Sequence, residues 1–258
     1  MKTNYKTNLK NNFGPHLLKL NRLVLLSCLS LFGFNTLAAP AKTPPKNIAL
    51  TYDLKRDGQL FAKVKEKYSQ KGSQYTITSI TKGEGIYALM GERKLTSSGE
   101  VAKNGLKPKH FEFYQGNNSK KTLINDFDWA NDMLNMQVKG NVKTESLVEG
   151  TQDLISYAYQ FMFVPPTFAR VGNNNINVVL TTGKKLSQYD YKVQSRGHLI
   201  DAAGKQFKTV HIANSPAENE EKKQLWLAED YHYLPVQYQL TDENGANFEQ
   251  TLTSINVE

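Results

Sequence analysis

The chain has 258 residues, a single cysteine and a formal net charge of +8, from 32 lysines and arginines against 24 aspartates and glutamates. Residues 1–41 hold five of the basic side chains and no acidic one, so residues 42–258 carry 27 basic and 24 acidic side chains, a net charge of +3. This small excess is dispersed along the chain, which argues against a nucleic-acid-binding surface.

Residues 1–41 have the pattern of a secretory signal peptide. Lys19 and Arg22 precede the apolar run 23–34, and the small-residue stretch Ala39-Pro40-Ala41 follows it. The apolar run is well short of the roughly 20 residues that a spanning helix needs. We expect cleavage after Ala41, because a cut after Ala39 would place the rigid ring of Pro40 next to the scissile bond. The sequence therefore predicts an exported protein whose mature part is one domain, residues 42–258.

Cys28, the only cysteine, lies inside this leader. The stretch Leu25-Leu-Ser-Cys28 loosely resembles a lipoprotein attachment box, but the apolar run continues for six residues beyond Cys28. We therefore predict a cleaved leader and no lipid anchor at Cys28. A mature chain without cysteine excludes disulfides, a thiolate nucleophile and a cysteine-based zinc site.

Period-two alternation of apolar and polar residues dominates the mature chain. It is clearest over residues 60–68, 134–139, 189–194 and 236–240. Such alternation is typical of antiparallel strands with one face buried. Turn signals such as Asp57-Gly58 and Asn244-Gly245 separate the runs and supply the positive φ angles of tight hairpins. Counting runs between turns predicts roughly ten strands in a curved antiparallel sheet or open β-barrel.

One segment, residues 151–163, breaks the alternation and predicts the only helix. Thr151 is a candidate N-cap, Asp153 complements the helix dipole, and Pro165 and Pro166 follow the predicted end. The broad apolar face consists of Leu154, Ile155, Tyr157, Ala158, Phe161 and Met162. Two interpretations stay open: a core helix that seals the sheet, or a helix that lines a cavity for an apolar ligand.

The stretch 125–132 is the richest in acidic groups. Asp126 and Asp128 would point the same way on a strand and could hold a hard cation. A calcium loop of the helix-loop-helix type needs a further oxygen ligand and then a glycine, and this stretch has neither. We therefore expect the two carboxylates to bind turn amides while Phe127 and Trp129 pack inward, with no metal bound.

Motifs of the common enzyme classes are missing from the sequence. The mature histidines, His110, His198, His211 and His232, have no zinc-binding spacing. There is no nucleophile elbow, phosphate-binding glycine loop or dinucleotide fingerprint. We therefore predict no catalytic residue and no cofactor.

Several stretches in a fixed order resemble a known family. They are Gly105-Leu-Lys-Pro-Lys-His-Phe111, Asp126-Phe-Asp-Trp129, Gly150-Thr-Gln-Asp-Leu-Ile-Ser156, Trp226-Leu-Ala-Glu-Asp230 and Leu234-Pro-Val236. Behind a signal peptide, this set resembles the DUF3108 family of exported proteins from Gram-negative bacteria, over nearly the whole mature chain. The resemblance implies a periplasmic, β-rich domain, similar to the open barrels of periplasmic lipoprotein carriers, and it transfers no catalytic residue.

The leading functional hypothesis is a non-enzymatic, monomeric carrier of the cell envelope, peripheral to the membrane at most. Its ligand would be a lipid, an acyl chain or a lipoprotein tail. Candidate ligand-lining residues are Trp129, Tyr157, Phe161, Met162 and Trp226. The alternatives are an adaptor that binds another envelope protein, and a hydrolase of envelope polymers acting through Asp126, Asp128 or Glu229.

Overall fold

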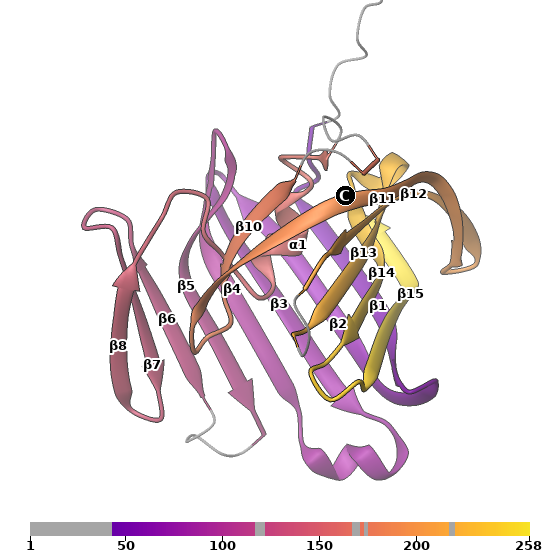
Figure 1. Cartoon of the computed structure of the whole chain (residues 1–258), viewed down its shortest axis with the longest axis horizontal. Coiled ribbons are helices and arrows are strands. Elements are labelled where there is room, and N and C mark those ends of the chain that lie inside the picture. Colours follow the sequence, from indigo (N-terminus) through magenta and orange to yellow (C-terminus); the bar gives the residue numbers. More distant parts are fainter. Residues whose placement is uncertain (1–42, 117–121, 167–170, 173–174, 217–219) are drawn as a thin grey trace, which may run out of the picture. The chain divides into compact units, whose positions relative to one another are not determined.

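A single sheet of fifteen strands makes up most of the described chain (Figure 1). The computed structural model describes residues 43–116, 122–166, 171–172, 175–216 and 220–258. The predicted leader, with Cys28 and the expected cleavage site, lies outside these residues. The prediction of a mainly β fold with one curved, open sheet is confirmed, whereas the strand number exceeds the roughly ten expected.

The strands follow one another as hairpins on both sides of the first strand. The N-terminal half consists of β1 (Asn47–Arg56), β2 (Gln59–Lys71), β3 (Gln74–Gly83), β4 (Arg93–Ala102), β5 (Gly105–Gln115), β6 (Leu123–Asp128), β7 (Met133–Val138) and β8 (Asn141–Ser146). The C-terminal half consists of β9 (Gln152–Asp153), β10 (Ile176–Thr181), β11 (Leu186–Ala202), β12 (Lys205–Asn214), β13 (Lys222–Ala228), β14 (Leu234–Thr241) and β15 (Asn247–Val257).

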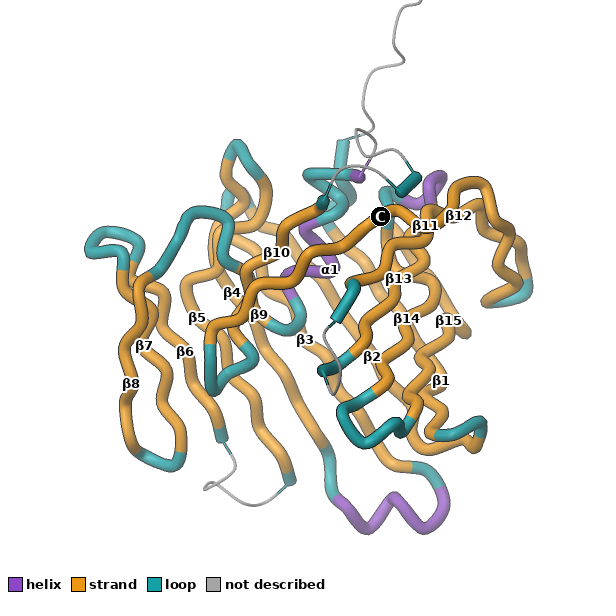
Figure 2. Tube along the Cα trace, viewed as in Figure 1, coloured by secondary structure: helices purple, strands orange, loops and turns teal. Residues whose placement is uncertain are grey.

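The two halves join where the first and last strands pair. β1 pairs antiparallel with both β2 and β15, so the sheet order runs from β8 to β1 and then from β15 down to β9 (Figure 2). All neighbours are antiparallel except the short pair β9–β10. The turn between β1 and β2 has φ angles of 50° at Asp57 and 83° at Gly58, which is the primed geometry that the Asp-Gly pair predicts.

The inner face of the sheet is apolar and unusually rich in tyrosine. Along β2, Ala62, Val64 and Tyr68 are buried while the intervening lysines are exposed, as the alternation predicts. Tyr68 stacks on Tyr75 of β3, with ring centroids 6.4 Å apart, and on Tyr159, at 5.8 Å. The interior therefore combines aromatic packing with hydroxyl groups that need hydrogen-bond partners.

The helix α1 spans Ser156–Gln160 and lies inside the curve of the sheet, against β5 and β14 (Figure 1). Within the described residues, 3-10 helices also lie between strands at Gly85–Met90 and Glu229–Tyr231. The described part of the chain has no helix with the length and apolar character required to span a bilayer.

The predicted helix, residues 151–163, is too long at both ends, because α1 ends at Gln160 and residues 161–163 form turns. Gln152 and Asp153 form strand β9, and Thr151 donates its hydroxyl hydrogen bond to the Val148 carbonyl instead of capping a helix. The helix starts later because Asp153 accepts from the backbone N–H of Ser156 while the Ser156 hydroxyl accepts from the N–H of Asp153. This reciprocal pair resembles a capping box and fixes the start of α1.

Candidate functional site

A cavity of about 470 Å³ lies between α1 with its preceding turn and the concave face of the sheet. One wall is formed by Leu154, Ile155, Tyr157 and Ala158. The other walls come from β1 to β4, β10 and β13 to β15, with side chains such as Val64, Leu95, Leu180, Leu225, Leu240 and Phe248. A largely apolar chamber of this size with a few polar groups is typical of a small-ligand site. We call it the inner cavity.

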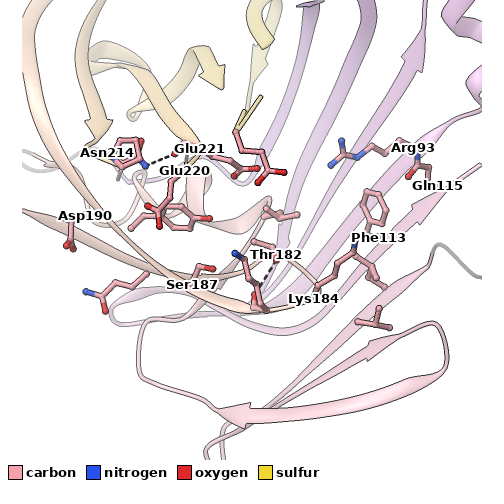
Figure 3. A pocket seen from close by; sticks show the side chains of 18 of the residues that line it. Arg93, Phe113, Gln115, Thr182, Lys184, Ser187, Asp190, Asn214, Glu220 and Glu221 are labelled. Carbon is pink, nitrogen blue, oxygen red and sulfur yellow. Dashed lines mark hydrogen bonds between the residues drawn. The ribbon is translucent and has the colours of Figure 1, made fainter. Parts of the chain in front are cut away.

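A wider opening of about 990 Å³, which we call the mouth, adjoins the inner cavity; Figure 3 shows the side chains that line it. The two spaces share four lining residues, Arg93, Leu154, Thr182 and Glu221. The mouth is mostly polar, whereas the inner cavity has more apolar wall. The site as a whole therefore has the polarity gradient of an amphiphile, with an apolar end inside and a polar end outside.

Glu66 is an acidic group on the inner face of β2 and lines the inner cavity. Its carboxylate accepts hydrogen bonds from the hydroxyls of Tyr159, at 3.0 Å, and Ser79, at 3.1 Å. Burial raises the pKa of Glu66, and the two hydroxyl donors oppose this shift without cancelling it. Glu66 thus anchors α1 to β2 and β3, and its protonated form is favoured relative to an exposed glutamate.

Two cations, Arg93 and Lys223, line the inner cavity and come from strands far apart in the sheet. Lys223 of β13 is 5 % exposed, lies 4.3 Å above the ring of Tyr189 and forms an ion pair with Glu221. Arg93, the first residue of β4, lies 4.8 Å above the ring of Phe113. Lys223 is thus neutralised within the protein, whereas the charge of Arg93 faces the mouth.

A buried polar chain holds the helix at the edge of the cavity. The Ser97 hydroxyl of β4 donates to the Asp153 carboxylate at 2.6 Å and lies 3.1 Å from the Tyr75 hydroxyl of β3. Asp153 also accepts from the backbone N–H groups of Ile155 and Ser156. Burial raises the pKa of Asp153 to about 6, although these hydrogen bonds favour its charged form.

This shift makes the free energy of unfolding depend on pH. Because the pKa of Asp153 rises from 3.8 to about 6 on folding, the native state binds more protons between these values. We expect Asp153 to lower the free energy of unfolding by about 2.4 kcal/mol as the pH rises from about 4 to 7. Urea unfolding of the wild type and Asp153→Asn at each pH checks this, because asparagine does not titrate. A difference curve that is flat over this range would contradict it.

The structure separates the five predicted lining residues. Tyr157 lines the inner cavity. Phe161 and Met162 are buried just beyond α1, in two different parts of the core, and do not line it. Of the three wall residues predicted in this segment, Tyr157 therefore borders the inner cavity, whereas Phe161 and Met162 pack in the core.

Both tryptophans also lie away from the cavity lining. Trp226 stacks on His211 at 4.1 Å on the other face of β13, because Leu225 and Leu227 take the inward positions of the alternation. Trp129 follows β6, where its indole N–H donates to the Pro108 carbonyl at 2.6 Å and Lys107 lies over its ring. Their large apolar surfaces cover the sheet instead of lining the cavity.

Glu66 and Arg93 line the cavity but were not among the predicted site residues, although the sequence contains a signal for both. Position 66 belongs to the same inward series as 62, 64 and 68, so a glutamate there is a charged side chain directed into the core. Arg93 precedes Leu95 and Ser97 on the inner face of β4 in the same way. A charge at an inward position of an otherwise apolar series marks the site.

The three acids proposed for hydrolysis each have a separate partner. Asp126 lies 2.7 Å from His110, Asp128 accepts hydrogen bonds from its own turn, and Glu229 pairs with Lys208 at 3.5 Å. The turn role predicted for Asp128 is thus confirmed, whereas Asp126 binds a histidine side chain. Across the described ranges, no group of three or more histidine, cysteine, aspartate or glutamate side chains is arranged to hold a metal ion.

One solved structure shares this architecture. The chain is similar to the β-barrel-like protein of domain of unknown function DUF1849 from Brucella abortus, with a TM-score of 0.55 and 12 % identity over 84 % of this chain and 99 % of that one. A candidate lipoprotein from Parabacteroides distasonis ATCC 8503 gives a TM-score of 0.38 and 8 % identity over 83 % and 100 %, a likeness too weak to support an argument. At 12 % identity the first similarity shows the fold alone.

Sequence comparisons place the chain in a family. No curated protein matches it. The family model described as "Protein of unknown function (DUF3108)" matches residues 49–253, which includes most of β1, every strand from β2 to β14 and most of β15. The chain therefore belongs to the DUF3108 family.

Proposed function

We propose that this protein is a non-enzymatic binding or carrier protein of the cell envelope, which acts in the periplasm and holds the apolar chain of a lipid-like molecule. The observation that supports this most is the inner cavity of about 470 Å³ between α1 and the sheet. An apolar chain inside it would be removed from water along most of its length, which is the main driving force for binding such molecules.

The composition of the cavity wall fits this ligand class. Leucine, valine and phenylalanine side chains provide apolar contact, and Tyr157 adds an amphipathic ring. Glu66 is a carboxylate that lines the inner cavity, and its raised pKa together with its two hydroxyl donors reduces the cost of placing it beside an apolar chain. The polar mouth would leave the head group of the ligand in contact with water.

Export to the periplasm rests on the predicted leader, residues 1–41. The full chain should be produced with this leader in a Gram-negative host and purified from the periplasm without detergent. Native mass spectrometry should then show a mature chain beginning at Lys42 with an added lipid mass that organic extraction removes. A protein without added mass, which also fails to bind an apolar dye, would argue against the carrier function.

A second candidate function is an adaptor that binds another envelope protein. Ile86 and Leu89, in the 3-10 helix after β3, are 79 % and 93 % exposed, which favours a contact surface there. A photo-crosslinking amino acid at position 89 would recover one specific protein partner in cells if the adaptor function holds. The carrier function is preferred because the interior is hollow, whereas an adaptor requires no cavity.

A further inference from the structure

Arg93 has an unusual position for a cation. It is the first residue of β4 and shares the inner face of that strand with Leu95 and Ser97. It lines both the inner cavity and the mouth, so it lies where the apolar and polar parts of the site meet. The residue remains exposed to the solvent of the mouth, and its side chain points into the opening (Figure 3).

The charge of Arg93 is not matched from within the protein. Its guanidinium lies over the ring of Phe113, 4.8 Å from the centroid. Of the carboxylates in the described parts of the chain, none forms a salt bridge with it. Lys223 differs, because Glu221 neutralises it. The planar guanidinium therefore keeps donors available for a ligand.

The mouth has charges of both signs, because Lys139, Lys184 and Lys185 line it together with Arg93 and the acidic side chains. Arg93 and Gln115 lie on one side of the mouth, and Asp190 and Glu221 lie on the opposite side (Figure 3). An anion in the mouth would be attracted toward Arg93 and repelled from the acidic side, whereas the apolar chain attached to it could enter the inner cavity past Leu154. The three lysines do not line the inner cavity, so among the described residues Arg93 is the cation of the mouth that lies next to the apolar chain of a bound anion.

We propose that Arg93 binds the head group of the ligand, and that this head group is an oxyanion, either a carboxylate or a phosphate. Two parallel N–H···O hydrogen bonds from the guanidinium would hold either group, since both match the fork of arginine. This inference rests on the proposed carrier function, because it requires that the apolar chain of the same molecule occupies the inner cavity.

The test compares three ligands that share one chain and differ in the head group. The measurement is displacement of the fluorescent dye N-phenyl-1-naphthylamine from the exported protein. The competing ligands are laurate, dodecyl phosphate and dodecanol. The variants are Arg93→Gln and Arg93→Lys, with Lys94→Gln as the matched control, since Lys94 is exposed and lies on the outer face of the same strand.

Arg93→Gln should weaken laurate and dodecyl phosphate by about 10- to 100-fold, because a charge-assisted hydrogen-bonded pair is lost. Dodecanol should change by less than about 2-fold, since its hydroxyl gains little from a cation. Arg93→Lys should keep part of the affinity for the two anions. Lys94→Gln should bind all three ligands with wild-type affinity. The tighter of the two anions in the wild type identifies the source as a fatty acid or a phosphate-bearing lipid.

Two outcomes would overturn the head-group assignment alone: wild-type protein that binds dodecanol as tightly as the anions, or Arg93→Gln affecting all three ligands equally. In both cases the dye and the ligands still bind, so the carrier function survives. If neither the dye nor any dodecyl compound binds the wild type, the carrier function fails and the head-group assignment fails with it.

Discussion

Replacing Ala158 with tryptophan should abolish ligand binding while the fold survives. Ala158 belongs to α1, and its methyl group forms part of the wall of the inner cavity. An indole there would occupy space that the ligand chain needs, and forcing both into the same volume costs as much as overpacking a core. We expect affinity for N-phenyl-1-naphthylamine and for laurate to fall by about 100-fold.

The measurement is dye fluorescence, with Ala158→Leu as a graded variant that should weaken binding less. Ala49→Trp is the matched control, because Ala49 is exposed on the opposite face of β1. Urea unfolding of each variant reports whether the fold is kept. If Ala158→Trp binds the dye like Ala49→Trp, the ligand does not occupy the inner cavity.

Replacing Tyr159 with alanine should produce the largest loss of stability among the substitutions proposed for this protein. Tyr159 is fully buried, stacks on Tyr68 of β2 at 5.8 Å and donates its hydroxyl hydrogen bond to Glu66. Removing the ring leaves a cavity between α1 and the sheet and removes a donor from a buried carboxylate. We expect the free energy of unfolding to fall by about 4 kcal/mol.

Tyr159→Phe separates the two contributions, because it keeps the ring and removes only the hydroxyl. This variant should lose about 1–2 kcal/mol. Urea unfolding followed by circular dichroism measures both changes. A Tyr159→Ala protein within 1 kcal/mol of the wild type would show that the stacked tyrosine does not hold α1 against the sheet.

The alternation of apolar and polar residues predicts the sheet well because each strand buries one face. Leu134 and Met136 of β7 are fully buried, as their spacing predicts. The strand count was too low because register shifts interrupt the period of two. In β11 the register shifts between Val193 and Ser195 and again between Arg196 and His198, so this strand does not keep one alternation. β9, with two residues, is too short for any periodic signal.

The candidate site was harder to predict from the sequence than the sheet, because its residues come from segments that are far apart in the chain. The start of α1 depends on how Asp153 bonds to Ser156 and to Ser97, 56 residues earlier in the chain. The two tryptophans were predicted to line the cavity because of their size. Which side chains reach the cavity depends instead on the face of the strand to which they point. Trp226 therefore lies outside, and Glu66, at an inward position, lies inside.

The central claim is that a ligand chain occupies the space between α1 and the sheet. A fatty acid with a terminal diazirine, bound to the exported protein and irradiated, tests it directly, because the label attaches to residues at the end of the chain. The account predicts adducts on inner-cavity residues such as Val64, Leu95 and Leu225. Adducts confined to the outer face, for example around Trp226 and His211, would contradict it.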